Sequence, residues 1–365
     1  MKARLGDVCT VVSGSTPKST VPEYWDGDIK WITPAELSND TYIINDSARH
    51  ITALGVAKTG LKSFPAGTVI LSSRAPIGKT AIAGCEMFCN QGFKNLICSE
   101  KIDSKYLYYF LSDKTDYLNS LGRGATFKEI SKAIVENIEI PLPEVEEQKR
   151  IAARFERLLR LIQLQKAELE ELDKLVKSRF IELFGDYDLT HPQESWVTIK
   201  EIGTVVGGAT PKTDHDEYWG GSHRWITPAE LDADSGYIYD SVRKLTKAGV
   251  ESCSLQEMPV GTVFLSSRAP IGKMAIAGNT FYCNQGFKNI ICKEDITPRY
   301  LYTVLLLNVE YLNSLGRGAT FKEISKGIVE NIRIPVPAME LQKQFAAFVE
   351  QTDKSKLCGK MEVAA

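Results

Sequence analysis

The pattern of apolar and polar positions changes character near residue 143. Before it, short apolar runs are separated by glycine and proline, which is typical of strands and turns. The clearest runs are 68–71, 80–83, 94–98 and 135–140. Residues 104–111 have helical spacing instead, and Ser104 is the expected N-cap. This mixture predicts an α+β globular part.

After Pro141-Leu142-Pro143 the pattern becomes that of one long helix over residues 144–185, with Gly185 as its expected stop. Apolar residues recur at alternating steps of about three and four, which indicates a heptad seam. The seam residues are Phe155, Leu158, Ile162, Leu169, Leu172, Val176, Phe180 and Leu183. A helix of about 40 residues is roughly 60 Å long. It cannot bury such a stripe alone, so we expect a partner helix.

The whole pattern occurs twice in the chain, as an internal sequence repeat. Matching segments of the two copies are always 194 positions apart. Examples of equivalent residues are Trp31 and Trp225, Arg74 and Arg268, and Arg123 and Arg317. Solenoid repeats are only about 20–50 residues long, so this repeat is a duplicated domain. The predicted organisation is a globular domain over 1–143, a spacer helix over 144–186, a second globular domain over 187–337, and a second helix with its tail over 338–365.

The second helix matches the first only in part. Gln342 corresponds to Gln148 and Val349 to Phe155, but residues 172–183 have no counterpart. We expect the two helices to pair antiparallel in a pseudo-two-fold arrangement, leaving about half of the long helix without an internal partner. The candidate partner-binding residues are Phe155, Leu158, Ile162, Leu169, Leu172, Val176, Phe180, Leu183, Phe345 and Val349. An uncovered stripe would favour a partner protein or self-association.

The segments shared by both copies contain groups suited to DNA. Amides can pair with adenine, and arginine or lysine beside glycine can approach phosphates. The candidates are Ser72, Ser73, Arg74, Lys79, Asn90, Gln91, Lys94, Arg123, Thr126 and Lys128 in the first copy, and Ser266, Ser267, Arg268, Lys273, Asn284, Gln285, Lys288, Arg317, Thr320 and Lys322 in the second. The alternative is structural, because Asn and Gln in turns often satisfy backbone groups and Gly-Lys often closes a hairpin.

Net charge, hydropathy and cysteine content limit the classes of protein to which this chain can belong. The net charge is −2, which argues against a protein that coats nucleic acid non-specifically but allows a reader with local positive charge. No apolar stretch is long enough for a membrane span and no signal core opens the chain, so we expect a cytoplasmic protein. Eight cysteines without a Cys-x-x-Cys pair favour reduced, buried thiols over a zinc site.

Over nearly its whole length the chain resembles the specificity subunits of type I restriction–modification enzymes. The matching segments are Gly14-Ser15-Thr16-Pro17, Trp31-Ile32-Thr33-Pro34, residues 72–78, residues 90–94, and Ile140-Pro141-Leu142-Pro143 before Glu147-Gln148. The resemblance implies two target recognition domains, each reading half of a bipartite site in double-stranded DNA. It implies helices that dock two modification subunits carrying S-adenosylmethionine, and allows for restriction subunits that use ATP and magnesium. It implies no cofactor and no catalytic residue in this chain.

Two rival interpretations stay open. A methyltransferase would need an Asn/Asp-Pro-Pro-Tyr/Phe tetrapeptide, and a P-loop would need an upstream glycine that precedes Gly78-Lys79 at the right spacing; neither occurs. The first rival is therefore a nuclease or methyltransferase with an unfamiliar active site. The second is a coiled-coil scaffold that does not bind DNA. Neither explains why the motifs are doubled.

Overall fold

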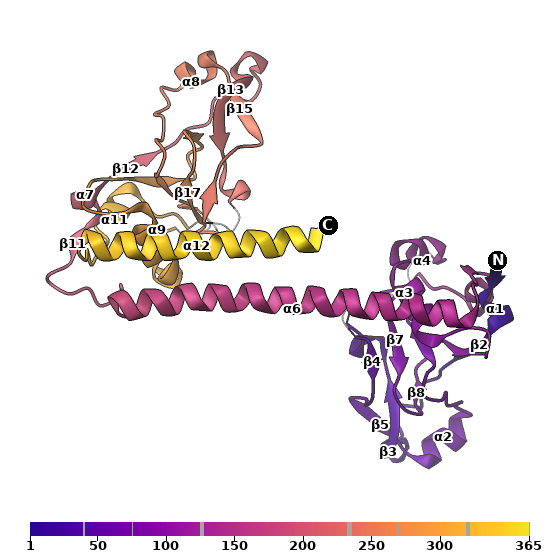
Figure 1. Cartoon of the computed structure of the whole chain (residues 1–365). Coiled ribbons are helices and arrows are strands. Elements are labelled where there is room, and N and C mark those ends of the chain that lie inside the picture. The colour runs from indigo at the N-terminus through magenta and orange to yellow at the C-terminus, as the bar shows by residue number, and fades with distance from the viewer. Residues whose placement is uncertain are drawn as a thin grey trace. The chain divides into compact units, whose positions relative to one another are not determined.

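The computed structural model describes residues 1–38, 41–74, 76–124, 128–231, 236–268, 270–318 and 322–364, with the backbone alone over 357–364. The chain divides into two compact units, Met1–Gln163 and Leu164–Ala365. None of the helices in these described ranges combines the length and the apolar character that a membrane span requires. Figure 1 shows the helices and strands of both units, with labels where there is room.

The first unit contains three sheets and a set of short helices. A five-stranded sheet has the order β2-β9-β6-β7-β4, a three-stranded sheet has the order β5-β3-β8, and β1 pairs with β10. The elements are β1 (Lys2–Arg4), α1 (Leu5–Val8), β2 (Cys9–Ser13), η1 (Pro22–Tyr24), β3 (Trp25–Ile32), η2 (Pro34–Glu36), β4 (Ile43–Ile44), β5 (Arg49–Ile51), α2 (Ala53–Thr59), β6 (Val69–Leu71), β7 (Thr80–Ala83), β8 (Phe88–Cys89), β9 (Lys94–Cys98), α3 (Ser104–Ser112), α4 (Thr115–Leu121), α5 (Lys132–Glu136) and β10 (Glu139–Pro141), followed by the first part of α6 (Val145–Phe184).

The second unit repeats this plan. Its sheets have the orders β12-β19-β16-β17-β14, β15-β13-β18 and β11-β20. The elements are β11 (Val197–Thr198), α7 (Ile199–Ile202), β12 (Gly203–Gly207), η3 (Asp216–Tyr218), β13 (Trp219–Ile226), η4 (Pro228–Glu230), β14 (Tyr237–Ile238), β15 (Arg243–Leu245), α8 (Lys247–Ser252), β16 (Val263–Leu265), β17 (Met274–Ala277), β18 (Tyr282–Cys283), β19 (Lys288–Cys292), α9 (Pro298–Leu307), α10 (Val309–Ser314), α11 (Lys326–Glu330), β20 (Arg333–Ile334) and α12 (Met339–Ala364). The predicted α+β class and the tandem duplication are therefore confirmed.

Two local predictions were wrong. Residues 135–140 are not one strand, because α5 ends at Glu136 before the short strand β10 begins at Glu139. The apolar run is shared between a helix and a strand, and both place apolar side chains in the core. Ser104 does not cap α3; the carboxylate of Asp103 accepts hydrogen bonds from the amides of Lys105 and Tyr106. Aspartate is as good a cap as serine, and it stands one residue earlier.

The shared segment around Gly14 is explained by a close backbone approach. A Cβ atom on Gly14 would lie 2.0 Å from the carbonyl oxygen of Cys89. The backbone thereby comes close enough for the amide of Ser15 to donate to the same carbonyl, at 3.0 Å. The indole of Trp31 in turn donates to the carbonyl of Ser15 at 3.0 Å. Only glycine fits at this position.

In the second unit the two long helices pair. Phe180 on α6 is 1 % exposed and packs edge-to-face on Phe345 of α12, with ring centroids 5.3 Å apart. Nearer the start of the paired stretch of α6, Asp173 forms an ion pair with Lys356. Residue numbers fall along α6 as they rise along α12, so the predicted antiparallel pairing is confirmed within this unit (Figure 1).

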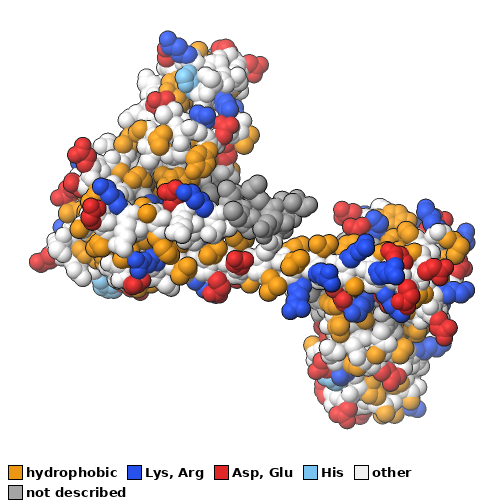
Figure 2. Space-filling view, in the orientation of Figure 1, with side chains coloured by type: hydrophobic (Ala, Val, Ile, Leu, Met, Phe, Trp, Pro, Cys, Tyr) orange, Lys and Arg blue, Asp and Glu red, His pale blue; other side chains and the backbone are white. Residues whose placement is uncertain are grey.

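Among the described residues of the first unit, no second long helix packs against α6 as α12 does in the second unit. Four large apolar residues of α6 in the first unit are about half exposed, namely Phe155, Leu158, Leu159 and Leu161, and Leu164 at the start of the second unit is similarly exposed. Figure 2 shows hydrophobic side chains at the surface along this helix. The sequence left open which end of the seam would lack an internal partner. Among the described residues it is the end that begins with Phe155 and Leu158, because α12 covers the seam around Phe180.

A buried glutamine fixes the start of each long helix to its globular part. Gln148 is fully buried, and its amide oxygen accepts from the backbone amide of Asp103 at 2.9 Å. Its amide nitrogen donates to the carbonyls of Lys101 at 3.0 Å and Pro143 at 2.8 Å. Gln342 makes the corresponding three bonds in the second unit. This network ties three chain segments together at one side chain.

We predict that Gln148→Ala lowers the free energy of unfolding by about 3 kcal/mol, because three partly buried backbone groups lose their partner and each unsatisfied group costs about 1–3 kcal/mol less any water that enters. Chemical denaturation measures the change. Gln163→Ala on the exposed surface of the same helix is the matched control and should change it by less than about 0.5 kcal/mol. Equal effects of the two substitutions would contradict the assignment.

Candidate nucleic-acid interface

The repeated Ser-Ser-Arg segment forms a tight turn after β6 and β16. The buried hydroxyl of Ser72 donates to the carbonyl of Pro76 at 2.7 Å and accepts from the amide of Lys79 at 2.9 Å. Ser73 is also buried and accepts from the ammonium of Lys94 at 3.3 Å. Ser266 and Ser267 repeat these contacts in the second unit. These four hydroxyls therefore hold the turn, and DNA contact by them stays an untested prediction.

The amides of the second segment are also engaged within the protein. The side-chain oxygen of Asn90 accepts from the amide of Gly92 at 2.9 Å. Gln91 is exposed, and its side-chain oxygen accepts from the hydroxyl of Thr16 at 2.5 Å. Asn284 and Gln285 make the same contacts. Lys79 donates to the carbonyl of Leu37, whereas its counterpart Lys273 is exposed. Gln91 and Gln285 thus present an exposed amide, and Asn90 and Asn284 cap their own turns.

The third segment is a loop closed at its base by backbone pairing. The amides and carbonyls of Arg123 and Glu129 bond reciprocally, both at 3.0 Å, and Arg317 and Glu323 pair likewise. The side chains of Arg123 and Lys128, and of Arg317 and Lys322, are exposed. Thr126 and Thr320, the remaining candidates, lie outside the described residues. Each loop therefore presents two exposed cations at the surface, which suits phosphate contact.

A carboxylate joins the loop to the turn. Oε2 of Glu129 lies 3.0 Å from Nε of Arg74, and Oε1 lies 3.1 Å from Nζ of Lys94. In the second unit Glu323 pairs with Arg268 and Lys288, both at 3.1 Å. We call each set the ion triad. The lysine side chains are 8 % and 14 % exposed and the arginine side chains 46 % and 50 %, so each triad buries one cation and presents the other.

The triads keep their carboxylates ionised. Burial by itself would raise the pKa of Glu129, but the hydrogen bonds and charges of Lys94 and Arg74 outweigh it and hold this pKa below its ordinary value. The pKa of Glu323 is lowered for the same reasons by Lys288 and Arg268. One carboxylate between two cations leaves one net positive charge in each triad at neutral pH.

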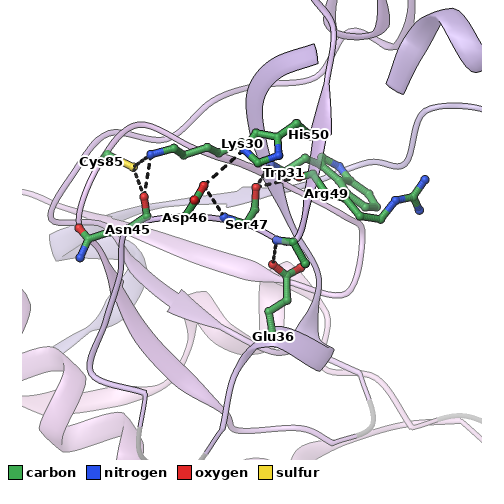
Figure 3. Close-up of polar contacts among 10 residues, drawn as sticks. Lys30, Trp31, Glu36, Asn45, Asp46, Ser47, Arg49, His50 and Cys85 are labelled. Carbon is green, nitrogen blue, oxygen red and sulfur yellow. Dashed lines mark hydrogen bonds and ion pairs between the residues drawn. The ribbon is translucent and has the colours of Figure 1, made fainter. Parts of the chain in front are cut away.

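The three-stranded sheet β5-β3-β8 carries polar contacts, shown in Figure 3, that differ from those of the matching sheet in the second unit. Lys30 donates to the carbonyl of Asn45 at 2.7 Å, and His50 lies 3.3 Å from the carboxylate of Asp46. The amide of Ser47, followed by Lys30 and His50, holds the pKa of Asp46 below its ordinary value. At the matching positions of the second unit, Arg224 and Lys244 both pair with Asp240. The units therefore share the ion triad but display different cations on this sheet.

Sequence reasoning selected the cations and missed the carboxylate. Glu129 and Glu323 lie inside the repeated segments, and this repetition was the only available signal. From the sequence alone, a glutamate in a basic loop is interpreted as a solvated surface residue. Only the structure shows that the strand carrying Lys94 lies beside it. The sequence also expected Phe180, Phe345 and Val349 to meet a partner, whereas all three are buried within the second unit.

Among the described residues no cluster of three His, Cys, Asp or Glu side chains could hold a metal ion.

A family model described as "Type I restriction modification DNA specificity domain" matches residues 1–174 and 194–359, once for each unit. The chain belongs to this family of DNA specificity domains.

Several named proteins are similar to this specificity-domain chain. The MjaIX type I restriction enzyme specificity subunit of Methanocaldococcus jannaschii is 41 % identical over 188 residues, covering 51 % of this chain and 44 % of that protein. The MjaVIII specificity subunit of the same organism is 24 % identical, covering 96 % and 85 %. This chain therefore aligns with less than half of the MjaIX subunit but with most of the MjaVIII subunit.

Solved structures share the fold. A chain from a structure of complex assembly and conformational transition of the type I R-M system superposes with a TM-score of 0.63 at 20 % identity, covering 100 % of this chain and 92 % of the other. A crystal structure of the type I restriction–modification S subunit from M. genitalium gives 0.60 at 16 % identity with the same coverages. The duplicated domains and long helices are thus the fold of this specificity-domain family.

We predict that Arg123→Ala or Arg317→Ala weakens binding of the chain to duplex DNA about equally for all sequences. Loss of one phosphate contact should lower the slope of log affinity against log salt by about 1. Fluorescence anisotropy across a salt series measures both quantities. Lys101→Ala, which removes an exposed charge from the same unit, is the matched control. A slope unchanged in the arginine variants would place these side chains away from the phosphates.

Proposed function

We propose that this chain is the DNA specificity subunit of a type I restriction–modification system and is not itself an enzyme. Its two globular parts, residues 1–143 and 187–337, act as target recognition domains that each read half of a bipartite site. The observation that carries this proposal is the ion triad beside an exposed basic loop, repeated with nearly the same distances in both units. A protein with a single site would have no need of two.

The helical segments, 144–186 and 338–365, provide the docking surface for two modification subunits in this proposal. Those subunits would bring S-adenosylmethionine, and restriction subunits would bring ATP and magnesium. The support is the apolar stripe on α6. Burying a fully exposed side chain of this kind contributes roughly 1.5–3 kcal/mol, and since these side chains are about half exposed, docking would gain about half of that for each. Exposed apolar stripes of this extent commonly mark protein interaction sites.

The rival proposals differ in what the isolated chain can do. An enzyme with an unfamiliar active site would cleave or methylate DNA when incubated with magnesium and S-adenosylmethionine. A scaffold would not bind random duplex DNA at all. A specificity subunit binds DNA and leaves it unchanged until modification subunits are added.

The first test is methylation mapping of DNA from cells that carry the complex. Since the two units share their triads and loops, we predict a bipartite target whose half-sites are similar and inverted, with unread base pairs between them. Two unrelated half-sequences would contradict this prediction and would assign readout to the segments in which the units differ, such as the two matching sheets that carry Lys30 in the first unit and Arg224 in the second.

The second test concerns the exposed stripe. Leu158→Asp with Leu161→Asp should abolish assembly with modification subunits while leaving thermal stability unchanged, because both side chains are about half exposed in the chain alone. Light scattering measures assembly. Leu54→Asp, at a similarly exposed leucine on α2, is the matched control.

Two other outcomes of this experiment are informative. A wild-type chain that dimerises alone, and a double variant that does not, would assign the stripe to self-association. A double variant that assembles normally would remove residues 158–161 from the docking surface.

A further inference from the structure

The ion triad orients its arginine in a particular way. Nε of Arg74 is engaged by Glu129, and among the described residues neither Nη1 nor Nη2 has a protein partner. The same is true of Arg268, which is held through Nε by Glu323. A planar guanidinium fixed at one edge keeps its other donors in a defined direction, whereas a free arginine side chain samples many rotamers.

We propose that Arg74 and Arg268 each read one guanine in the major groove, and that Glu129 and Glu323 are positioning residues that aim them. This inference rests on the proposed function. The O6 and N7 atoms of guanine are two acceptors side by side, and an arginine fork pairs with both. A guanidinium held by a carboxylate through Nε keeps its two terminal nitrogens available for that pair.

The carboxylate of Glu129 also favours a DNA base, rather than a phosphate, as the group that Arg74 contacts. Glu129 is an anion 3.0 Å from the guanidinium, so a phosphate approaching Arg74 would meet a like charge. A guanine edge is neutral and meets no such repulsion. Arg123 and Lys128 have no carboxylate partner among the described residues, and they suit phosphates better. In this proposal the cation of the turn, Arg74, contacts a base, and the cations of the loop, Arg123 and Lys128, contact phosphates.

The buried lysine completes the arrangement. Lys94 is too deeply placed to reach DNA, with 8 % of its side chain exposed, yet it neutralises the second oxygen of Glu129. Without Lys94 the pair of Arg74 and Glu129 would have no net charge. With it the triad keeps one positive charge, so Arg74 can be held by a carboxylate and still face the negative potential of DNA.

The duplication supplies an internal control. The full chain, assembled with its modification subunits, is used to select bound molecules from a pool of random duplexes, and the selected sequences give the preference at each position of both half-sites. We expect one guanine at the equivalent position of each half-site. Arg74→Ala and Glu129→Gln should each lower the guanine preference about tenfold in one half-site only. Arg268→Ala and Glu323→Gln should do so in the other.

Glu129→Gln separates positioning from simple charge. Removing an anion should strengthen or preserve binding to random duplex DNA, so lost guanine preference cannot come from weaker attraction. Arg74→Lys keeps the charge but has no planar fork, and we expect it to lose the preference as Arg74→Ala does. Replacing the identified guanine by 7-deazaguanine, which lacks the N7 acceptor, should weaken wild-type binding and leave Arg74→Ala unaffected.

Other outcomes would overturn the inference. An unchanged guanine preference in Arg74→Ala would remove Arg74 from base readout, and a uniform loss of affinity with all preferences kept would make it a phosphate contact. An unchanged preference in Glu129→Gln would remove the positioning role. If this variant melts early because Lys94 has lost its counterion, the double variant with Lys94→Met removes both charges and decides the same question. A wild-type complex that selects no sequence at all would instead defeat the proposed function.

Discussion

A carboxylate that must be neutralised determines the arrangement of the candidate interface. Glu129 emerges from a loop base, and its two oxygens are satisfied by a buried cation on β9 and an exposed cation on the turn after β6. The loop, the strand and the turn are distant in the sequence, so this ion triad is possible only once the sheet has formed. The second unit builds the same triad from Glu323. The position of the exposed arginine in each candidate interface depends on this ion pairing.

The long helix α6 obeys a second constraint, that an apolar stripe must be covered. In the second unit Phe180 meets that need inside the chain, against Phe345 and Tyr300. The stripe from Phe155 to Leu164, which begins in the first unit and ends at the start of the second, stays about half exposed among the described residues. Because Gln148 fixes the start of α6 to its globular part by three hydrogen bonds, a protein docked on this stripe would be held in register with the interface.

The sequence predicted the larger features and missed those that depend on long-range contacts. A repeat of 194 residues and a heptad seam were enough for the duplication, the helix α6 and its antiparallel pairing. The strands β7 and β9 were predicted at their observed bounds, since both are short runs between glycines or turns. The residues 135–140 were misassigned because apolar residues at positions 135, 138 and 140 fit both a short helix and a strand. The candidate site was found only through its cations. Glu129, Glu323 and the roles of the buried serines depend on which segments meet in space, and no local pattern encodes that.

The central claim is that one chain reads DNA at two separate places with two equivalent interfaces. Hydroxyl-radical footprinting of the chain with its modification subunits on a duplex that contains the methylated site tests this claim most directly. Two protected tracts, separated by unprotected base pairs and related by inversion, are the predicted result. One continuous tract that stays the same after Arg74→Ala and Arg268→Ala, or no protection, would contradict the account.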